Sequence, residues 1–410
     1  MVPKGWRFCK LADISRVTSG GTPNRAISEY WQNGTIPWIR TTEVQNCILQ
    51  PEDAKEYISE LGLRKSSAKL IPENTILLAM IGQGKTRGQI ALLKFEAAIN
   101  QNCAAIIFGK SQEPEFYYHY LLSQYENIRN LSNSAGQSNL SGALVKAINV
   151  LVPPYNEQKK IAQILSTWDK AISVTEKLLT NSQQQKKALM QQLLSGKKRL
   201  LDENGVRFSG EWKRVKLGAI ADMNSGGTPK STVEEYYGGN IPWVSISDMT
   251  SNGKWIATTE KYLTELGLNS SSARIYPKNS VLYAMYASIG ECSIAAVNLT
   301  SSQAILGIRP KDCLNYEFLY FYLTSLKEKI KLQGQQGTQS NLNAGMVKEF
   351  ELDLPSIREQ QKIAAVLSAA DAEISTLEKK LACLRDEKKA LMQQLLTGKR
   401  RVKVDEAVAV

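Results

Sequence analysis

Two long stretches of the chain carry apolar residues at alternating spacings of four and three positions. The first runs from Ile161 to Leu193 and the second from Ile363 to Leu395. This spacing is the a/d pattern of a coiled coil, in which the apolar stripe of one helix packs against the stripe of another. Lys186 and Lys388 interrupt the two stripes at equivalent places. We therefore expect two paired helices that are held together partly by contacts other than apolar packing.

Residues that favour helix ends flank both stretches. Pro154 and Pro355 come before them, and Gly196 and Gly398 follow them. Proline suits the first turn of a helix, and glycine suits the position just past its end. These boundaries predict two helices of about 39 residues, each about 58 Å long at about 1.5 Å per residue.

The remaining sequence has the features of mixed domains. Short apolar runs at 75–78, 103–108 and 148–152 lie between Gly, Pro and Asn residues, which favours strands. Helical periodicity is present at 113–131 and at 316–332. Both strands and helices are therefore expected in the two parts of the chain outside the long helices.

The chain consists of two copies of one unit. Nine residues at 186–194 recur unchanged at 388–396, and the motif at 19–23 recurs at 225–229. Repeats of this length are domain-sized rather than solenoid-sized. We predict an α/β (α+β) fold in which two similar mixed domains are separated by two long helices that form an antiparallel coiled coil, with an internal pseudo-twofold repeat. The boundaries are a first mixed domain at 1–154, a helical region at 155–200, a second mixed domain at 201–354, a second helical region at 355–402 and a tail at 403–410.

Composition narrows the class of protein. The 410 residues are 43% hydrophobic, which is enough for several cores, and the net charge of +12 with a pI near 9.2 fits a polyanionic partner. No apolar run approaches the length of a membrane span and no signal peptide opens the sequence, so we expect a cytoplasmic protein with no membrane partner. The six cysteines include no C-x-x-C pair. They are expected to be reduced thiols without a metal.

Three sequence features could indicate a catalytic site, but each lacks residues that such a site requires. The sequence at 84–86 matches the end of a P-loop, but Ala79 stands where the first glycine of that motif is required. The sequence at 152–155 is similar to the loop with which amino-methyltransferases hold a base, but it begins with valine. His119 is the only histidine, so histidine triads and zinc sets cannot be built. We expect no catalytic residue, although a methyltransferase with a decayed motif and a purely structural helical dimer stay open as alternatives.

Two unequal basic domains joined by two similar helices suit an asymmetric, two-part DNA site. Major-groove approaches on one face of a duplex recur about every 34 Å, a distance that such helices can bridge. Motifs shared by both copies are expected to shape turns or contact phosphates, whereas polar loops that differ are expected to read bases. The candidate DNA-binding residues are Arg25, Arg40, Gln83, Lys85, Arg87, Gln89, Ser138 and Asn139 in the first copy, and Lys230, Ser245, Ser247, Asp248, Tyr286, Ser288, Ser340 and Asn341 in the second.

The nine shared residues predict a protein partner. The coiled-coil stripe requires only their leucines, yet the residues off the stripe are also identical while the mixed domains have diverged. Both helices are therefore expected to present one surface to two copies of the same partner. The candidate partner-binding residues are Lys187, Met190, Gln191 and Gln192 on the first helix, and Lys389, Met392, Gln393 and Gln394 on the second.

The arrangement resembles the specificity subunit of type I restriction-modification systems. The resemblance covers nearly the whole chain and rests on the two variable domains, on the proline-led Glu-Gln helix starts at 154–158 and 355–360, and on the Lys-Lys-x-Leu-Met-Gln-Gln-Leu-Leu-x-Gly-Lys helix ends. Since the first domain begins almost directly at Trp6, we expect any preceding helix of the family to be short or missing.

The resemblance implies two target recognition domains that each read half of an interrupted double-stranded DNA sequence, and two helical regions that set the spacing. It also implies two modification subunits, which carry S-adenosylmethionine and methylate adenine, and restriction subunits that cleave DNA with ATP and Mg. The chain itself would hold no cofactor, no metal and no catalytic residue.

Overall fold

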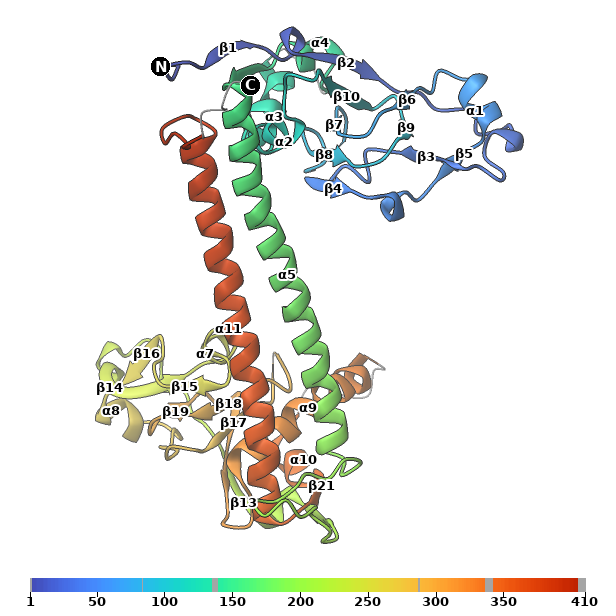
Figure 1. Ribbon diagram of the computed structural model, residues 1–410. Coiled ribbons are helices and arrows are strands. Elements are labelled where there is room, and N and C mark those ends of the chain that lie inside the picture. The colour runs from blue at the N-terminus through green and yellow to red at the C-terminus, as the bar shows by residue number, and fades with distance from the viewer. Residues whose placement is uncertain (1, 83, 135–138, 287, 336–341, 405–410) are drawn as a thin grey trace. The chain divides into compact units, whose positions relative to one another are not determined.

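The computed structural model describes residues 2–82, 84–134, 139–286, 288–335 and 342–404, and its chain divides into two compact units (Figure 1). Unit 1 contains the chain up to Glu176 and again from Lys379 onward, and unit 2 contains Lys177–Glu378. The helices α5 (Tyr155–Leu193) and α11 (Ile357–Leu395) are each 39 residues long. Each helix begins in one unit and ends in the other, so each unit combines one mixed domain with parts of both helices.

The mixed domain of unit 1 is built on a five-stranded sheet with the order β2-β10-β7-β8-β4. All neighbouring pairs are antiparallel except β4 and β8, which are parallel. The strands are β2 (Ser15–Ser19), β10 (Cys103–Phe108), β7 (Thr75–Ala79), β8 (Ile90–Leu93) and β4 (Cys47–Leu49). Strands β7 and β8 are fully buried, because both faces of the sheet are covered.

Alternation along β7 separates two cores. Ile76 and Leu78 pack in the larger core, with the aromatic residues of α2 (Pro114–Ser123) and the first turns of α5. Leu77 and Ala79 point to the opposite face and pack in a smaller core. Successive side chains of a strand point to opposite faces, so this one strand joins the helical layer to the outer part of the domain.

The outer part of unit 1 is a small four-stranded sheet with the order β5-β3-β9-β6. Its strands are β5 (Tyr57–Ile58), β3 (Ile36–Ile39), β9 (Ala97–Ile99) and β6 (Leu70–Ile71). The pair β1 (Arg7–Lys10) and β11 (Asn149–Val152) closes the domain at its other end. The remaining helices are α1 (Glu60–Arg64), α3 (Tyr125–Ser134) and α4 (Gly142–Lys146), with short 3₁₀ turns at Leu11–Asp13, Ser28–Tyr30 and Pro51–Asp53.

Unit 2 repeats this plan. Its five-stranded sheet has the order β13-β20-β17-β18-β15, and a smaller sheet has the order β16-β14-β19. The strands are β13 (Ala221–Ser225), β20 (Ile305–Pro310), β17 (Val281–Ala284), β18 (Cys292–Ala295), β15 (Trp255–Ile256), β16 (Lys261–Leu263), β14 (Tyr237–Val244) and β19 (Thr300–Ser301), with β12 (Lys213–Lys216) paired to β21 (Glu351–Leu354). The helices are α6 (Leu217–Ile220), α7 (Ile246–Asn252), α8 (Glu265–Asn269), α9 (Tyr316–Gln335) and α10 (Ala344–Lys348), with a 3₁₀ turn at Glu234–Tyr236. The predicted mixed fold and its repeat are confirmed.

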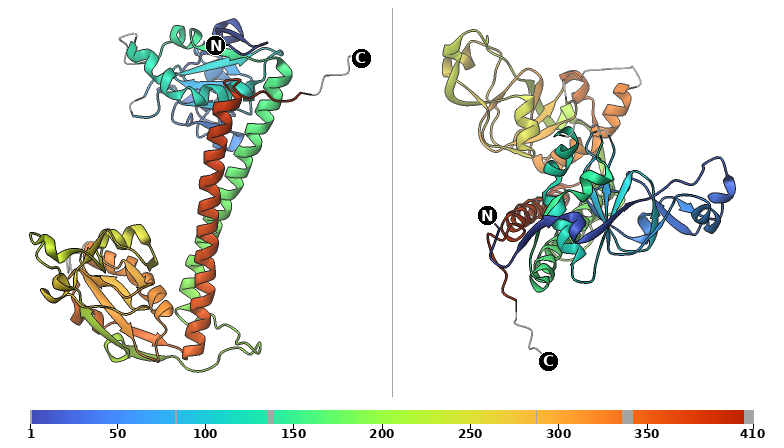
Figure 2. Two further views of the ribbon diagram at one scale, coloured as in Figure 1. Left: turned by 90° about the vertical axis from the view of Figure 1, so that its left-hand side faces the viewer. Right: turned by 90° about the horizontal axis from the view of Figure 1, so that it is seen from above.

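Within each unit the beginning of one long helix lies beside the end of the other (Figures 1 and 2). The polar stripe positions have partners: Ser182 Oγ donates to Glu373 Oε1 at 2.8 Å, and the ammonium groups of Lys186 and Lys388 pair with Asp371 and Asp169. The expectation that polar contacts support the pair is therefore met. The first stripe residues also pack into the core of a mixed domain, a contact that the heptad pattern alone does not reveal.

One predicted element differs from the structure. The helix expected at 113–131 is divided into α2 and α3, because Gln124 leaves helical geometry (φ −98°, ψ 11°) and caps the end of α2. The hydroxyl of Ser123 donates to the carbonyl of Tyr120 at 2.6 Å. Such a local side-chain hydrogen bond competes with the continuing helix.

Candidate functional site

The loop between β7 and β8 of unit 1 holds four of the eight first-copy candidates for base contacts. Glycines in the left-handed region set its course, with φ values of 137° at Gly82, 69° at Gly84 and 88° at Gly88. Residues other than glycine rarely adopt these values. The hydroxyl of Tyr125 donates to the carbonyl of Lys85 at 2.6 Å, and Arg129 Nη1 donates to that hydroxyl at 3.0 Å. The loop is therefore held in a defined shape from the side of α3.

The side chains of this loop differ in their exposure to solvent. Lys85 is exposed, Arg87 and Gln89 are half-buried, and Gln83 lies outside the described residues. Asn139 is exposed and precedes a residue whose amide donates to the carbonyl of Met80 at 2.9 Å. The segment of Asn139 thus adjoins the base of the same loop. Ser138 lies outside the described residues.

Arg25 and Arg40 do not belong to that loop but meet around one carboxylate. Arg25 Nη2 lies 2.6 Å from Glu56 Oε2, and Arg40 Nη1 lies 2.5 Å from Glu56 Oε1. Arg40 also pairs with Glu43 at 2.9 Å. Burial raises the pKa of Glu43, but hydrogen bonds from Arg40 and Thr42 outweigh it and lower the pKa overall. Both arginines are therefore committed to ion pairs within the domain.

The corresponding place in unit 2 is the N-terminus of α7. Asp248 is 5% exposed and accepts hydrogen bonds from the amide of Ser245 at 2.8 Å and from the amide of Glu260 at 2.9 Å. Asp248 therefore completes a capping box with the N-cap residue Ser245 and ties the helix to the segment just before β16, which leaves its carboxylate no free surface for a base. Ser245 shares a hydrogen bond of 2.8 Å with the exposed Ser247.

The remaining second-copy candidates lie on loops. Lys230 is exposed, as are Tyr286 and Ser288 between β17 and β18. Ser288 has a φ of 25°, and Glu291 at the end of this loop pairs with Lys327 of α9. Ser340 and Asn341 lie outside the described residues, but the amide of Leu342 donates to the carbonyl of Met285 at 3.0 Å. Leu342 thus adjoins the β17–β18 loop, as the equivalent Leu140 adjoins the β7–β8 loop in unit 1.

The motif shared at 19–23 and 225–229 brings two stretches of backbone close together. A Cβ on Gly20 would lie 1.8 Å from the carbonyl oxygen of Ile99, and one on Gly226 would lie 2.2 Å from that of Ser301. The indole of Trp38 donates to the carbonyl of Gly21 at 3.0 Å. Only glycine permits this close approach of two backbones.

An arginine–glutamate–tryptophan cluster around a buried glutamate, which the sequence reasoning missed, joins each domain to the helices. In unit 2, Arg199 donates to both oxygens of Glu359, at 2.6 and 2.7 Å, and the indole of Trp212 donates to the same carboxylate at 3.2 Å. Glu359 is 2% exposed. We call this the unit 2 clamp; it fastens the segment after α5 and the start of the domain to the beginning of α11.

Unit 1 contains the equivalent set, the unit 1 clamp. Arg401 donates to both oxygens of Glu157, and the indole of Trp6 donates to Glu157 Oε2 at 3.2 Å. Arg401 Nη1 also donates to the carbonyl of Lys4 at 2.7 Å. The signal for both clamps was present in the Glu-Gln helix starts and in the arginine that follows each Gly-Lys, but nothing in the spacing links these distant residues.

The glutamine of each helix start has a related structural role. Gln158 Oε1 accepts from the amide of Glu113 at 2.9 Å, and Gln360 Oε1 accepts from the amide of Asn315 at 2.8 Å. Their amide groups donate to the carbonyls of Pro153 and Pro355, both at 2.9 Å. The Glu-Gln motif therefore orients the mixed domain on the long helix, through hydrogen bonds of two buried glutamine side chains.

The candidate partner-binding residues fall into two groups. Met190 and Met392 are half-buried and pack against the cores of units 2 and 1, so part of their identity is explained by packing. The other six, Lys187, Gln191, Gln192, Lys389, Gln393 and Gln394, are exposed. No structural contact within the described residues accounts for the side chains of this exposed set.

The motifs that suggested catalysis occupy structural positions. Val152 is buried at the end of β11, paired with Arg7 of β1. His119 is 1% exposed on α2, where burial and the nearby Lys388 lower its pKa to about 3. Among the described residues, no group of three or more side chains is arranged to hold a metal ion, and no helix is both long and apolar enough to cross a membrane.

Comparison with known proteins agrees with this architecture. Residues 3–181 and 209–384 match the family model described as type I restriction modification DNA specificity domain. The specificity subunit of the type I restriction enzyme MjaIX from Methanocaldococcus jannaschii is 36% identical over 172 residues, which are 41% of this chain and 40% of that protein. The putative MjaX specificity subunit of the same organism is 24% identical over 425 residues, covering 98% of this chain and 95% of that one.

A solved structure shows the same fold. The S subunit of a type I restriction-modification system from M. genitalium has a TM-score of 0.62 at 16% identity, with 96% of each chain covered. The two matched regions each contain one mixed domain and most of the long helix that follows it. The chain therefore belongs to the family of type I restriction-modification DNA specificity subunits, with two copies of its characteristic domain.

Proposed function

We propose that this chain is the DNA-reading subunit of a type I restriction-modification complex, in which each mixed domain reads one half of an asymmetric, interrupted double-stranded DNA sequence. The observation that carries the proposal is the contrast between the two copies. The same framework of sheet, clamp and helix start supports loops of different chemistry: Gly-Lys-Thr-Arg-Gly at 84–88, but Tyr286 and Ser288 in the second copy. Equal scaffolds with unequal loops suit two different half-sites.

The reading loops are expected to act through the exposed residues that the structure leaves at their surfaces. Lys85 offers an ammonium group that suits guanine acceptors or a phosphate. Arg25, Arg40 and Asp248 are engaged in contacts within their domains. Any DNA contact by the two arginines would exchange an internal ion pair for one with DNA, so we rank them below the loop residues.

We further propose that two modification subunits bind the exposed lysines and glutamines at the ends of α5 and α11. S-adenosylmethionine, adenine methylation and the ATP- and Mg-dependent cleavage by restriction subunits then belong to partners, and this chain supplies recognition and spacing. The exposed set is chemically identical on both helices, and the structural contacts around it are also repeated. The amide of Lys198 donates to the carbonyl of Gln192 and that of Arg400 to the carbonyl of Gln394, both at 3.1 Å.

The recognition proposal is tested by exchanging the loop at 82–89 for a loop of different sequence that keeps its three glycines. Methylated adenines are then mapped across the host genome. One half of the methylated motif should change and the other should not. Lys65→Ala, at an exposed lysine of the same domain, is the matched control and should leave the motif unchanged. A change in both halves, or in neither, would contradict the assignment of this loop.

The partner proposal is tested by charge reversal at one helix end at a time. Native mass spectrometry of the assembled complex should show two modification subunits with the unaltered chain, one with K187E or K389E, and none with both. Lys177→Glu, at an exposed position of α5 away from the shared residues, is the control and should retain two. A single substitution that removes both partners or neither would refute two equivalent binding sites.

A further inference from the structure

The outer parts of the two mixed domains share one framework. Ser59 Oγ donates to the carbonyl of Glu29 at 2.7 Å, and Thr264 Oγ1 donates to the carbonyl of Glu235 at 2.7 Å. Gly62 approaches the carbonyl of Tyr30, and Gly267 approaches that of Tyr236. Residues on either side of these points can therefore be paired across the two domains, although the segment between them is one residue shorter in unit 2.

In unit 1 the guanidinium of Arg25, a planar cation, lies against this framework. The guanidinium of Arg25 lies 3.7 Å from the ring centre of Trp31 and 4.9 Å from that of Trp38. Its Nη2 pairs with Glu56 at 2.6 Å. Stacking on aromatic rings and a carboxylate partner are the two interactions that an arginine favours, so the place is filled and its charge is balanced.

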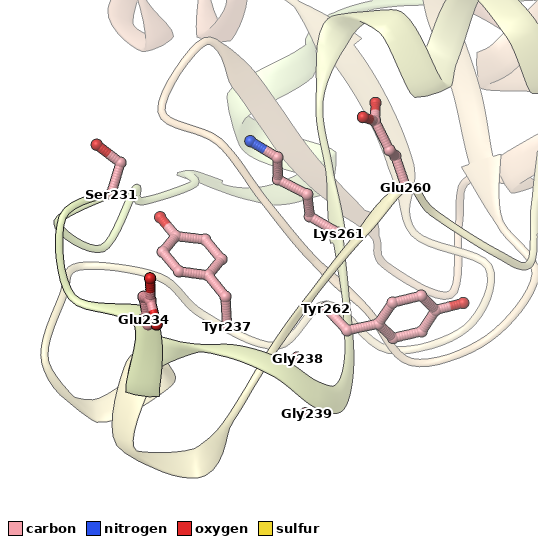
Figure 3. Close-up of a pocket in the computed structure, with 8 residues that line it drawn as sticks. All are labelled: Ser231, Glu234, Tyr237, Gly238, Gly239, Glu260, Lys261 and Tyr262. Atoms are coloured by element: carbon pink, nitrogen blue, oxygen red, sulfur yellow. The ribbon is translucent and has the colours of Figure 1, made fainter.

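In unit 2 three of the four members of that arrangement are changed, and Trp243 keeps the tryptophan at the place of Trp38. Ser231 stands at the place of Arg25, Tyr237 at that of Trp31 and Lys261 at that of Glu56. The shorter serine leaves a cavity of about 610 Å³, whose lining includes Ser231, Glu234, Tyr237 and Lys261. Figure 3 shows Tyr237 and Lys261 pointing into the same space, with Ser231 at its edge. Within the described chain, Lys261 has no ion-pair partner.

The chemistry of this cavity selects a neutral planar ligand with both hydrogen-bond donors and acceptors. Tyr237 offers an aromatic surface, and its hydroxyl is occupied by the carbonyl of Pro229 at 2.8 Å. Lys261 can donate only, and Glu234 can accept only. The carboxylates of Glu234 and Glu260 at the lining disfavour a phosphate group by repulsion between like charges.

We propose that this cavity binds a single unstacked nucleobase, and that guanine fits it best. Guanine offers acceptors at O6 and N7 to Lys261 and N–H donors to Glu234, while its ring stacks on Tyr237. The source is a base of the DNA that the protein reads, so the inference rests on the proposed function. In the first domain the same place is closed by Arg25, which makes the two domains unequal in this respect too.

The experiment measures binding of the full chain to three duplexes by fluorescence anisotropy. One is fully paired, one carries a single unpaired guanine, and one carries an abasic site at the same bulge. The guanine duplex should bind about tenfold more tightly than the abasic duplex, equivalent to about 1.4 kcal/mol and within the range for stacking one base. Equal affinity for these two duplexes would overturn the proposal. Affinity for the paired duplex reports separately on the proposed function.

Variants that copy residues of the first domain assign the effect to the cavity. S231R/K261E rebuilds the arginine–glutamate pair that unit 1 carries and should abolish the guanine preference without affecting the paired duplex. Lys261→Met keeps the size of the side chain and should reduce the preference, which provides a second test if the double variant folds poorly. The reverse change, R25S/E56K, should create a second guanine site. A preference that persists in S231R/K261E would refute the assignment.

A further experiment distinguishes a base within DNA from a free nucleoside as the ligand. Equilibrium dialysis of the full chain against guanosine measures binding of the nucleoside alone. Binding of guanosine together with a preference for the guanine bulge supports the proposal. Binding of guanosine without that preference would exclude a base of DNA as the ligand.

Discussion

Replacing Arg199 by alanine should destabilise unit 2 far more than its partly exposed position suggests. The substitution removes a guanidinium that is 21% exposed, but it leaves a carboxylate that is only 2% exposed. An uncompensated buried charge typically costs about 3 to 5 kcal/mol. Trp212 still donates one hydrogen bond to Glu359 at 3.2 Å, which places our expectation near the lower end, at about 3 kcal/mol.

The structure also predicts how the stabilities of related variants should rank. Glu359→Gln leaves an arginine that can reach water, and it retains a neutral acceptor, so its cost should be about 1 to 2 kcal/mol. The double variant R199A/E359Q should be more stable than R199A, because no charge is then left buried. Arg214→Ala is the control: Arg214 pairs with Asp353 at 3.2 Å but the side chains are 67% and 50% exposed, so less than about 1 kcal/mol should be lost.

Hydrogen exchange followed by mass spectrometry measures the loss of stability in each segment of the chain separately. Opening of the first turns of α11 should become about a hundredfold faster in R199A, since about 1.4 kcal/mol corresponds to a factor of ten. Exchange in the sheet of unit 1 should be unchanged. If R199A lost less than about 1 kcal/mol, or if the double variant were no more stable than R199A, the buried charge would not be what the arginine compensates.

Three further outcomes are expected. Burial lowers the pKa of His119 in the folded chain to about 3, whereas an unfolded histidine gains its proton near pH 6.5. The free energy of unfolding should therefore fall by up to about 1.4 kcal/mol per pH unit as the pH drops between those values. His119→Phe, which copies Phe321 of the second repeat, should remove this contribution to the pH dependence of acid unfolding. Lys388→Met removes a cation that lowers the pKa of His119, so the proton-resonance titration of this lone histidine should move to higher pH, and an unchanged titration would count against the contact. Tyr125→Phe removes the hydroxyl that holds the loop at Lys85, and should weaken binding to the first half-site about fivefold, the equivalent of about 1 kcal/mol, with no change at a second half-site measured in the same DNA.

The sequence predicted those parts of the fold that have a periodic or repeated signal. Spacing of apolar residues gave the long helices, whose bounds of Tyr155–Leu193 and Ile357–Leu395 agree with the prolines and glycines that flank them. The strands at 75–79 and 103–108 were recognisable as short apolar runs. Strands of two residues, such as Leu70–Ile71, carry no pattern, because alternation cannot be seen over so short a length.

The contacts that build the sites are less accessible to sequence reasoning. Arg199 and Glu359 are 160 positions apart, and Arg401 and Glu157 are 244 apart, so no local rule connects them. Arg25 was recognisable as a polar loop residue, but only the fold brings it onto Trp31. A polar side chain in a divergent loop can stabilise the loop through internal contacts or can contact a ligand. Only the packing in the folded chain shows which of the two it does.

The two clamps also bear on how such genes can change. Each unit takes the beginning of one long helix and the end of the other, and the identical segments at 186–194 and 388–396 offer a site for unequal crossing-over between the two halves of one gene. The product would encode one domain and one helix, with a glutamate at the start of that helix and an arginine beyond its end. These two residues could not meet inside one short polypeptide in the arrangement seen here. A recombination event of this kind would therefore produce a half-length protein that completes its clamps by pairing with a second copy. If each domain reads one half-site, as we propose, such a pair would read two identical half-sites.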